Sequence, residues 1–449
     1  MKNKIYTHII AALLLCGICT GCSEDVFEEI DIMDIPVLLK GTFPTEGVTL
    51  EVGKSYTFEP KLKDDTNVQY SWMVNGAKVS SDPTYIFETT GLCQAEITCI
   101  IANEKGKITL KTSLKTNHDF TKGFFVVTAE EIGFYDTQKT AYYPSCYQAL
   151  NKGEKFNGDI YAIPNDDKLY VTVKTNVSNR DHLFVIDKKT LQKKSSTSVR
   201  ANLFYSFALD DRYMLLAGHS VYRYDTKSQT SVKLSNSIYP FIFRVGLLND
   251  KLLLSRSYGS NDDNLYYYDL ETVLNAEANQ LPDPTAISNI TQCDKSEFVK
   301  TADGSIFTLY SSSDDNEYKL LRISNDLTTE EIALSFAAPT TKWYDIYFPG
   351  IVGVSSTSEN FILIPSKDHA IYKYVVGDAS SLASPFIASP NAGIKLTGSG
   401  VQVDTETQKI YVLYSNSNVA VYNYDGTQVE VIELSEAPQH LIFTTEGSN

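Results

Sequence analysis

Residues 169–191 read LYVTVKTNVSNRDHLFVIDKKTL: an apolar strand, a polar loop and a second apolar strand that ends at Asp187. This unit recurs along the chain at a mean spacing of about 48 residues. A period in this range, with several strands per unit, is typical of a β-propeller. The seven strand pairs are 124–127 with 132–136, 169–173 with 183–187, 213–216 with 221–225, 252–254 with 265–269, 306–309 with 320–324, 361–364 with 371–374, and 410–413 with 419–425.

A further candidate strand precedes every unit except the first. These preceding strands are predicted at 158–163, 204–208, 241–245, 298–300, 344–348 and 401–403. The C-terminal stretch 438–443, Pro-Gln-His-Leu-Ile-Phe, supplies the strand that the first unit lacks. We therefore expect a seven-bladed β-propeller over residues 122–445 whose first blade is completed by the last strand, which removes an exposed sheet edge.

Residues 36–117 predict a smaller all-β domain before the propeller. Apolar positions alternate through short segments such as Tyr70-Ser71-Trp72-Met73-Val74, with a turn at Asn75-Gly76, so each strand has one buried face. This pattern predicts a two-sheet β-sandwich with Trp72 in its core. The arrangement around Trp72 and the alternating strand after Gly91 resemble a PKD or immunoglobulin-like module, which would act as a spacer.

The N-terminus predicts export. Lys2 and Lys4 precede an apolar run, 9–18, that is too short to span a membrane. The run ends at Cys19-Thr20-Gly21-Cys22, which resembles a bacterial lipobox, although Cys19 replaces the usual aliphatic residue. We expect a signal peptide at 1–21, lipidation of Cys22 and an acidic tether at 22–35. Acidic residues beside the lipidated cysteine resemble the surface-export signal of Bacteroidota lipoproteins, which implies an outer-membrane protein facing the exterior. A plain secretory signal is the alternative.

The charge and the cysteines narrow the possibilities further. The formal charge is −16, so phosphate backbones would be repelled and nucleic acid is excluded as a partner. The seven cysteines do not predict a set of disulfides. Cys93 and Cys99 lie too far apart along one predicted strand to pair, and Cys146 and Cys293 are isolated, so we expect buried thiols.

The predicted binding site lies on one face of the propeller. Because strands alternate in direction, the loop entering each inner strand and the loop between the second and third strands share a face. Phe156 and Ser399 are expected there together with seven ligand-binding candidates: Asn157, Tyr205, Tyr239, Lys342, Trp343, Tyr344 and His440. Trp343 and Tyr344 would supply flat apolar contact. Lys342, Asn157 and His440 would bind polar groups.

Two acidic loops on the same face carry oxygen atoms suited to calcium: Asp262 with Asp263, and Asp314 with Asp315. Neither follows the EF-hand spacing, and solvated turns are the alternative. The chain contains no His-Glu-x-x-His zinc motif and no Gly-x-Ser-x-Gly nucleophile elbow. We therefore expect a protein that is not an enzyme and has no cofactor.

The segments 183–191, 400–404, 410–412 and 421–426 are similar to the surface-layer-type, YncE-like propellers of Bacteroidota lipoproteins, which often follow a PKD-like module. Some members of that family bind vitamin B12 at the cell surface and pass the corrinoid to a TonB-dependent transporter. The resemblance implies a capture protein for a small nutrient, with a corrinoid as the expected ligand. An adhesive scaffold that binds protein or glycan, and a propeller hydrolase or lyase, are the alternatives.

Overall fold

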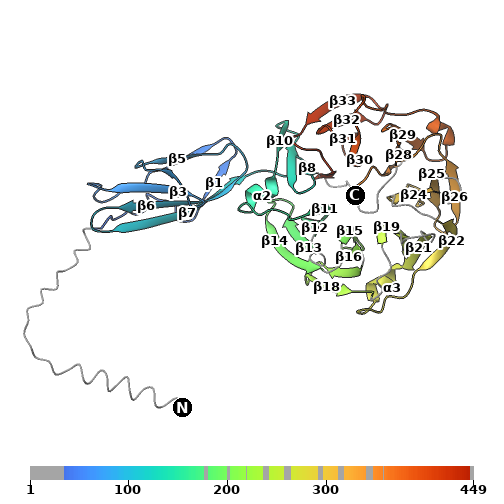
Figure 1. Cartoon of the computed structure of the whole chain (residues 1–449), viewed down its shortest axis with the longest axis horizontal. Helices are drawn as coiled ribbons and strands as arrows, with labels where there is room; N and C mark the ends of the chain where they lie inside the picture. The colour runs from blue at the N-terminus through green and yellow to red at the C-terminus, as the bar shows by residue number, and fades with distance from the viewer. Residues whose placement is uncertain are drawn as a thin grey trace, which may run out of the picture. The chain divides into compact units, whose positions relative to one another are not determined.

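The computed structural model describes residues 35–175, 181–199, 203–218, 220–235, 242–256, 264–291, 297–311, 318–339, 347–356 and 358–444. These residues form a small β-sandwich and a larger ring of β-sheets (Figure 1). Both units are built from strands, and the helices that connect strands are short. The predicted all-β class, with a sandwich followed by a propeller, is confirmed.

The sandwich contains a five-stranded sheet of order β1-β7-β6-β3-β4 and a two-stranded sheet of β2 and β5. Its core forms around Trp72, which is fully buried as predicted and whose indole N–H donates to the Asp82 carbonyl at 2.9 Å. Phe58 and Tyr85 pack against the indole ring. The strands are β1 (Val48–Glu51), β2 (Ser55–Phe58), β3 (Gln69–Val74), β4 (Ala77–Ser80), β5 (Tyr85–Glu88), β6 (Gln94–Ala102) and β7 (Lys107–Asn117).

The larger unit is a ring of seven antiparallel sheets, the blades of a propeller, in which the first-named strand of each blade is the innermost. Blade 1 contains β34 (His440–Phe443), β8 (Gly123–Val127), β9 (Ile132–Asp136) and β10 (Ala141–Tyr143). Blade 2 contains β11 (Asp159–Asn165), β12 (Lys168–Lys174), β13 (Asp181–Asp187) and β14 (Lys193–Val199). Blade 3 contains β15 (Leu203–Ala208), β16 (Tyr213–Gly218), β17 (Val221–Asp225) and β18 (Thr230–Lys233).

The remaining blades follow the same plan, except that blade 6 has three strands among the described residues. Blade 4 contains β19 (Ile242–Leu248), β20 (Lys251–Arg256), β21 (Asn264–Asp269) and β22 (Thr285–Thr291). Blade 5 contains β23 (Val299–Lys300), β24 (Ile306–Ser311), β25 (Tyr318–Ile323) and β26 (Thr329–Ala333). Blade 6 contains β27 (Val352–Ser355), β28 (Asn360–Pro365) and β29 (Ile371–Val375), and blade 7 contains β30 (Leu396–Asp404), β31 (Lys409–Tyr414), β32 (Asn418–Asn423) and β33 (Gln428–Glu433). Short helices between strands are α2 (Cys146–Leu150), α3 (Leu270–Asn275) and η2 (Ala379–Ala383).

The predicted inner strand of blade 6 is wrong at the two of its residues that the structure describes. The prediction placed the inner strand of blade 6 at 344–348, but Tyr347 and Phe348 precede β27 and belong to no strand. Pro349 and Gly350 follow them directly, and proline has no N–H to donate to a sheet ladder. The inner strand therefore starts only at Val352, which leaves Tyr347 and Phe348 free to enter the central channel.

The recurring aspartate at the end of the third strand has a structural reason. In blade 2 the Asp187 carboxylate accepts the backbone N–H groups of Lys189 at 3.1 Å and Thr190 at 2.9 Å. Asp225 accepts the corresponding N–H groups in blade 3. The side chain thus fixes the turn into the fourth strand, and this is why the unit carries aspartate there.

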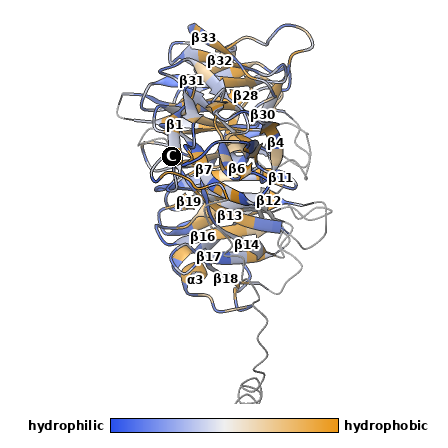
Figure 2. Ribbon diagram, turned by 90° about the vertical axis from the view of Figure 1, so that its left-hand side faces the viewer, coloured by the Kyte–Doolittle hydropathy of each residue, from blue (hydrophilic) through white to orange (hydrophobic). Residues whose placement is uncertain are grey.

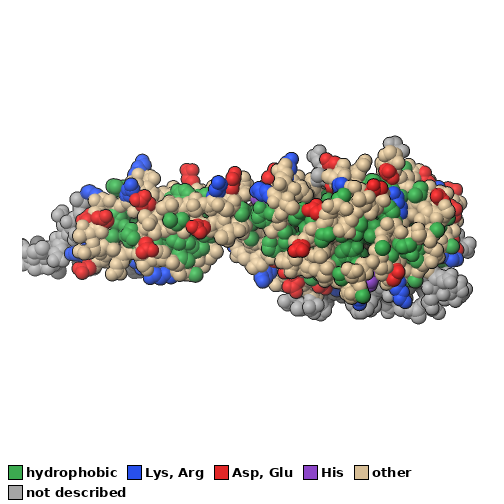
Figure 3. Space-filling view, turned by 90° about the horizontal axis from the view of Figure 1, so that it is seen from above, with side chains coloured by type: hydrophobic (Ala, Val, Ile, Leu, Met, Phe, Trp, Pro, Cys, Tyr) green, Lys and Arg blue, Asp and Glu red, His purple; other side chains and the backbone are tan. Residues whose placement is uncertain are grey.

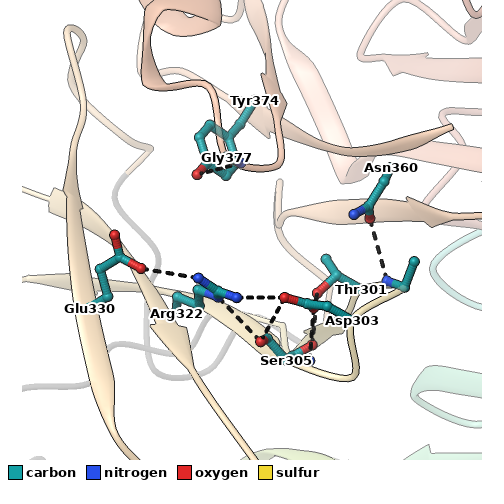
Figure 4. Close-up of polar contacts among 9 residues, drawn as sticks. Thr301, Asp303, Ser305, Arg322, Glu330, Asn360, Tyr374 and Gly377 are labelled. Atoms are coloured by element: carbon teal, nitrogen blue, oxygen red, sulfur yellow. Dashed lines mark hydrogen bonds and ion pairs between the residues drawn. The ribbon is translucent and has the colours of Figure 1, made fainter.

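A similar turn in blade 5 extends into a charged network (Figure 4). Asp303 accepts hydrogen bonds from Thr301 and Ser305, and its carboxylate contacts the Arg322 guanidinium at 2.5 Å. Arg322 also contacts Glu330 at 3.2 Å. Burial raises the pKa of Asp303, but these hydrogen bonds outweigh it and lower the pKa to about 2, so the carboxylate stays ionised at neutral pH.

Apolar side chains fill the spaces between the blades. The second and third strands are largely buried; five consecutive residues of β12, from Leu169 to Val173, are buried, and all five residues of β9 are buried. Hydrophobic residues follow the strands and hydrophilic residues gather at the turns (Figure 2). On the visible surface, acidic and basic side chains are interspersed (Figure 3). The blades therefore hold together mainly by burying apolar area between neighbouring sheets.

The ring closes as predicted. The last strand, β34, pairs antiparallel with β8, with His440 opposite Val127 and Phe443 opposite Phe124. Leu441 and Ile442 are only 1% and 3% exposed at this junction. The pairing gives blade 1 its fourth strand and covers the edge of β8.

Removing β34 is expected to destabilise the whole propeller. A chain that ends at Gln439 loses the apolar burial of Leu441, Ile442 and Phe443, about 1.5–3 kcal/mol for each side chain, and exposes the edge of β8. We expect its melting temperature to fall sharply and its tendency to aggregate to rise, as measured by calorimetry and light scattering. A chain that ends at Thr444 is the matched control and should melt like the full protein. Equal melting of both truncated chains would contradict closure by β34.

Candidate functional site

The seven blades meet in the central channel, where each contributes polar or aromatic side chains. These side chains form a cluster that we call the channel plug. Its members, in blade order from 1 to 7, are His440, Tyr161, Tyr205, Arg244, Glu297, Tyr347 with Phe348, and Gln402 with Ser399. They come from inner strands or from the loops that enter them, so the propeller geometry brings together residues from distant parts of the chain.

Tyr347 connects different sides of the channel. Its ring stacks on Tyr161 at a centroid distance of 5.0 Å and on His440 at 5.0 Å. Its hydroxyl accepts the Ala162 backbone N–H at 2.9 Å, which satisfies a donor on the channel edge of β11. Because these contacts join blade 6 to blades 1 and 2, side chains span the channel at this level.

Arg244 is a buried cation in the plug. Its side chain is 2% exposed, and Nε donates to the Glu297 carboxylate at 2.6 Å. The guanidinium also lies 5.0 Å from the ring centroid of Tyr205 and 4.5 Å from that of Phe348. Burial alone would lower the pKa of Arg244. Glu297 and the two buried phenols Tyr161 and Tyr205 raise the pKa by more than burial lowers it, so the guanidinium stays charged. A partner charge and aromatic faces together compensate for its lost hydration.

The tyrosines and the histidine of the plug are neutral. Burial raises the pKa of Tyr161, Tyr205 and Tyr347, so their hydroxyls stay protonated. Burial, with a smaller effect of the nearby Arg244 cation, lowers the pKa of His440 to about 3. The imidazole is therefore uncharged at neutral pH.

Hydrogen bonds hold the His440 ring in place. Nδ1 lies 2.8 Å from the Ser399 hydroxyl, and Nε2 lies 3.4 Å from the Gln402 amide nitrogen. Gln402 also donates to the Leu441 carbonyl at 2.9 Å. Gly398 permits this close approach of blades 1 and 7. It has φ 52°, and a Cβ there would lie 2.0 Å from the Gln439 carbonyl oxygen.

A cavity of about 640 Å³ lies in the channel on one side of the plug. Tyr205, Gln402 and His440 belong to both the plug and the cavity wall, so the plug forms the floor. The other lining residues are Ile163, Pro164, Asn165, Asp166, Ser206, Phe207, Ala208, Asp210, Asp211, Val352, Gly353, Val403, Thr405, Leu441, Ile442 and Phe443. Most of them lie where inner strands end, so the cavity opens toward the turns that follow these strands. We expected the site on the opposite face, at the loops that enter the inner strands, so the described cavity does not lie where the site was predicted.

The predicted site residues are only partly brought together. Tyr205 and His440 both line the cavity, whereas Asn157 is exposed in the loop before β11 and does not. Phe156 was expected in an open mouth, but it is a core residue, buried against Tyr147 at a centroid distance of 4.2 Å. Several candidates lie outside the described residues: Cys22, Tyr239, Lys342, Trp343, Tyr344, Asp262, Asp263, Asp314 and Asp315.

Sequence reasoning missed several plug residues, among them Tyr161, Arg244, Glu297 and Tyr347. One signal was available, because Arg244 interrupts the otherwise apolar strand Ile242–Leu248. An arginine in an inner strand needs a partner, and an inner strand borders the channel. The predicted boundary of the propeller at residue 122 also omitted Phe120, which packs into the same core as Phe125 and Phe134.

The described part of the chain holds no group of three or more His, Cys, Asp or Glu residues arranged to bind a metal ion. Within the same residues, no helix combines the length and apolar character needed to cross a membrane. Cys93, Cys99 and Cys146 are free thiols; Cys99 and Cys146 are buried as predicted, and Cys93 is half-buried. Cys293 lies outside the described residues.

Comparisons with known proteins agree with this architecture. Residues 121–444 match the family model described as Domain of unknown function (DUF5074), and residues 38–104 match that of a PKD-like domain. No curated protein matches the chain. These matches confirm a PKD-like module followed by a propeller-type domain.

Solved structures are also similar to this chain. A crystal structure of a Quinonprotein alcohol dehydrogenase-like protein from Bacteroides thetaiotaomicron has 34% identity and a TM-score of 0.81, and the match covers 92% of this chain and 100% of that one. The extracellular domain of a putative hybrid two component system from the same bacterium has 12% identity and a TM-score of 0.40, over 62% of this chain and 35% of that one.

The neutral His440 should make stability depend on pH. The folded pKa of about 3 lies below the ordinary value of 6.5, so on acidification the unfolded chain binds a proton that the folded chain does not. Stability from this group is full above about pH 6.5 and is lost as the pH falls toward 3. We expect the free energy of unfolding in urea to fall by about 1–3 kcal/mol between pH 7 and pH 4 because of His440.

A matched pair of variants isolates this contribution. His440→Gln keeps a polar side chain that does not titrate, so its loss of stability between pH 7 and pH 4 should be smaller than that of the unmodified protein. His182→Gln, which replaces a half-buried histidine of β13, controls for the loss of an imidazole elsewhere in the propeller. The same acid dependence in His440→Gln as in the unmodified protein would contradict a neutral, buried His440.

Proposed function

Because the chain belongs to the family described as Domain of unknown function (DUF5074), we propose a function from its own geometry: it is a surface-anchored, non-enzymatic protein that binds a small ligand in the propeller channel. The cavity above the channel plug carries this proposal. Its volume of about 640 Å³ lies in the range of small-molecule sites. The plug gives the cavity a closed floor, so a ligand would enter and leave from one side.

The lining of the cavity suits a ligand with both apolar surface and hydrogen-bonding groups. Phe207, Pro164 and Val352 offer apolar contact, and Asn165 and Asp211 offer polar atoms at the turns. A corrinoid has this character, since a flat macrocycle carries amide side chains around its edge. Amide N–H groups can donate to carboxylates and to amide oxygens. We therefore keep a corrinoid as the proposed ligand, and a TonB-dependent transporter as the protein that would receive it.

The chemistry of the plug favours binding over catalysis. A general base works best when its pKa is close to the operating pH, but burial lowers the pKa of His440 to about 3. The buried phenols have raised pKa values and are poor nucleophiles at neutral pH. Arg244 is held by Glu297. These groups are suited to forming a rigid floor. The similar Bacteroides structure is named dehydrogenase-like, and we take from it a likeness of fold and no activity.

The sequence supports a location at the cell surface. We propose that Cys22 is lipidated after removal of residues 1–21 and that the acidic tether directs the protein to the outer face of the outer membrane. The PKD-like module would then separate the propeller from the lipid surface. This arrangement would present the cavity to nutrients outside the cell.

Calorimetric titration of the soluble protein, starting at Ser23, with cyanocobalamin and cobinamide tests the proposed ligand. We expect one-to-one binding. Phe207→Ala removes an apolar wall of the cavity and should weaken binding by about 1–3 kcal/mol, roughly 5- to 150-fold in Kd. Phe336→Ala is the matched control because Phe336 is also half-buried but packs on Tyr372, away from the cavity. It should bind like the unmodified protein.

The loops predicted from the sequence are tested with Trp343→Ala. Weaker binding in this variant, with unchanged binding in Phe207→Ala, would move the ligand from the cavity to those loops. The absence of heat with either compound would remove the corrinoid from the proposal. Glycans and protein partners would then be the next ligands to test, as expected of an adhesive scaffold.

Anchoring is tested separately with Cys22→Ala. Without the acyl acceptor, we expect the protein to leave the membrane fraction and to lose labelling by a metabolically incorporated fatty acid. Surface exposure is measured by protease treatment of intact cells that express the unmodified chain. Continued membrane association of Cys22→Ala would show that a plain secretory signal, with another means of attachment, describes the N-terminus better.

A further inference from the structure

We infer that the half-buried carboxyl of Glu131 is a pH-sensitive switch on ring closure: the neutral group lets β34 dock on blade 1, and ionisation of the group loosens that strand. The inference concerns closure of the propeller and does not rest on the proposed ligand. Three observations carry it: the position of Glu131 beside the start of β34, a buried carboxyl oxygen without a partner, and the acidic groups around it.

Glu131 lies in the turn between β8 and β9, next to the start of the closing strand. The Thr128 backbone N–H closes this turn by donating to the Glu131 carbonyl at 2.9 Å. The preceding residue, Val127, accepts the Gln439 backbone N–H at 2.7 Å and is paired with His440. A displacement of the turn would therefore act directly on the first residues of the closing strand.

The Glu131 carboxyl has few hydrogen-bond donors around it. Its Oε1 atom is buried and has no hydrogen-bond partner among the described residues. Its Oε2 atom accepts the Ile132 backbone N–H at 3.4 Å, which is longer than a typical hydrogen bond. A buried carboxylate oxygen without a donor costs far more than the carbonyl oxygen of a neutral carboxylic acid. This geometry favours the protonated group.

The elements packed against Glu131 supply mainly groups that become negative when they lose a proton. These groups are Tyr142 of β10, Cys146 and Tyr147 of α2, and Glu436 in the connection between β33 and β34. Lys155, in the loop before β11, supplies a positive charge.

These surroundings set the proton affinity of the carboxyl. Burial raises the pKa of Glu131 from 4.5 to about 7, and the negative charge of Glu436 adds to the rise. The backbone N–H groups of Ile132 and Gln148, with the Lys155 cation, lower the pKa but offset only part of this effect. The carboxyl therefore gains or loses its proton near neutral pH.

Ionisation would act on the closing strand and on the cavity together. A carboxylate at this position lacks a donor for Oε1 and is repelled by Glu436, so it gains hydration by moving outward and displacing its turn. All four residues of β34, 440–443, line the channel cavity. Loosening of the strand would therefore also open one wall of the cavity.

The direction of the pH effect follows from proton linkage. The folded chain keeps the proton on Glu131 up to about pH 7, whereas the unfolded chain releases it near pH 4.5. The stability that comes from this proton is fully present below pH 4.5 and is lost as the pH rises through about 7. His440 acts in the opposite direction, because its contribution is lost on acidification.

Urea unfolding at pH 6 and pH 8 tests the inference with Glu131→Gln, which stays neutral at both pH values. The ratio of the unfolding constants of the unmodified protein and the variant isolates this carboxyl, because the other groups titrate in both proteins. We expect the ratio to rise by about three- to tenfold from pH 6 to pH 8, the lower value allowing for solvent screening of a half-buried group.

The matched control is Glu130→Gln, which changes the exposed carboxyl next to Glu131. The ratio of unfolding constants for this variant should stay constant between the two pH values. A constant ratio for Glu131→Gln as well would overturn the inference.

Hydrogen exchange of the β34 amides, corrected for the intrinsic pH dependence of exchange, tests the effect on the strand itself. The strand should open more readily at pH 8 than at pH 6 in the unmodified protein and in Glu130→Gln, but not in Glu131→Gln. Unchanged opening of β34, even with altered global unfolding, would place the effect elsewhere in blade 1 and overturn a switch on closure.

A ¹³C NMR titration of the glutamate carboxyls reads the proton directly in the unmodified protein and does not require Glu131→Gln to fold. We expect one glutamate with a midpoint near pH 7. Glu436→Gln should lower that midpoint, because it removes a neighbouring negative charge. Midpoints near 4.5 for every glutamate would overturn the inference. None of these measurements uses a ligand, so their outcome is independent of the proposed function.

Discussion

The pairing of β34 with β8 is the interaction on which the propeller depends. Each other blade is made from one contiguous segment, but blade 1 joins residues near both ends of the ring. The same short strand carries His440 into the channel and Leu441 and Ile442 into the core. Closure of the ring, packing of the first blade and construction of the cavity floor are thus three effects of a single pairing.

The channel plug shows how a ring of apolar sheets accommodates charge at its centre. A buried guanidinium such as that of Arg244 is tolerated because Glu297 and two aromatic rings replace its hydration. The partners come from different blades, so the contacts also connect parts of the ring that do not share a sheet. Because Tyr347 reaches both Tyr161 and His440, loosening of one blade would disturb the floor of the cavity.

The sequence predicted the scaffold well because the scaffold is periodic. The repeated strand pairs and the aspartate turns, as at Asp187, are local features that recur along the ring. The channel is not periodic: the residues that the blades contribute differ, and contact between Tyr161 and Tyr347 depends on positions that only the closed ring brings together. Blade 6 adds a second difficulty, since Pro349 displaces its inner strand and Phe348 packs on Arg244. Of the predicted ligand residues that the structure describes, Tyr205 and His440 line the cavity, and Asn157 does not.

The position of β34 also imposes an order on folding. Blades 2 to 7 consist of contiguous segments and can form as soon as each has been synthesised, whereas blade 1 waits for residues 440–443. The hydrogen bond between the Thr444 hydroxyl and the Gly123 carbonyl joins residues 321 positions apart. Such a distant contact is slow to form and leaves the edge of β8 open until it does. Completion of the ring therefore comes last, and the nascent chain carries an unpaired strand edge through most of its synthesis.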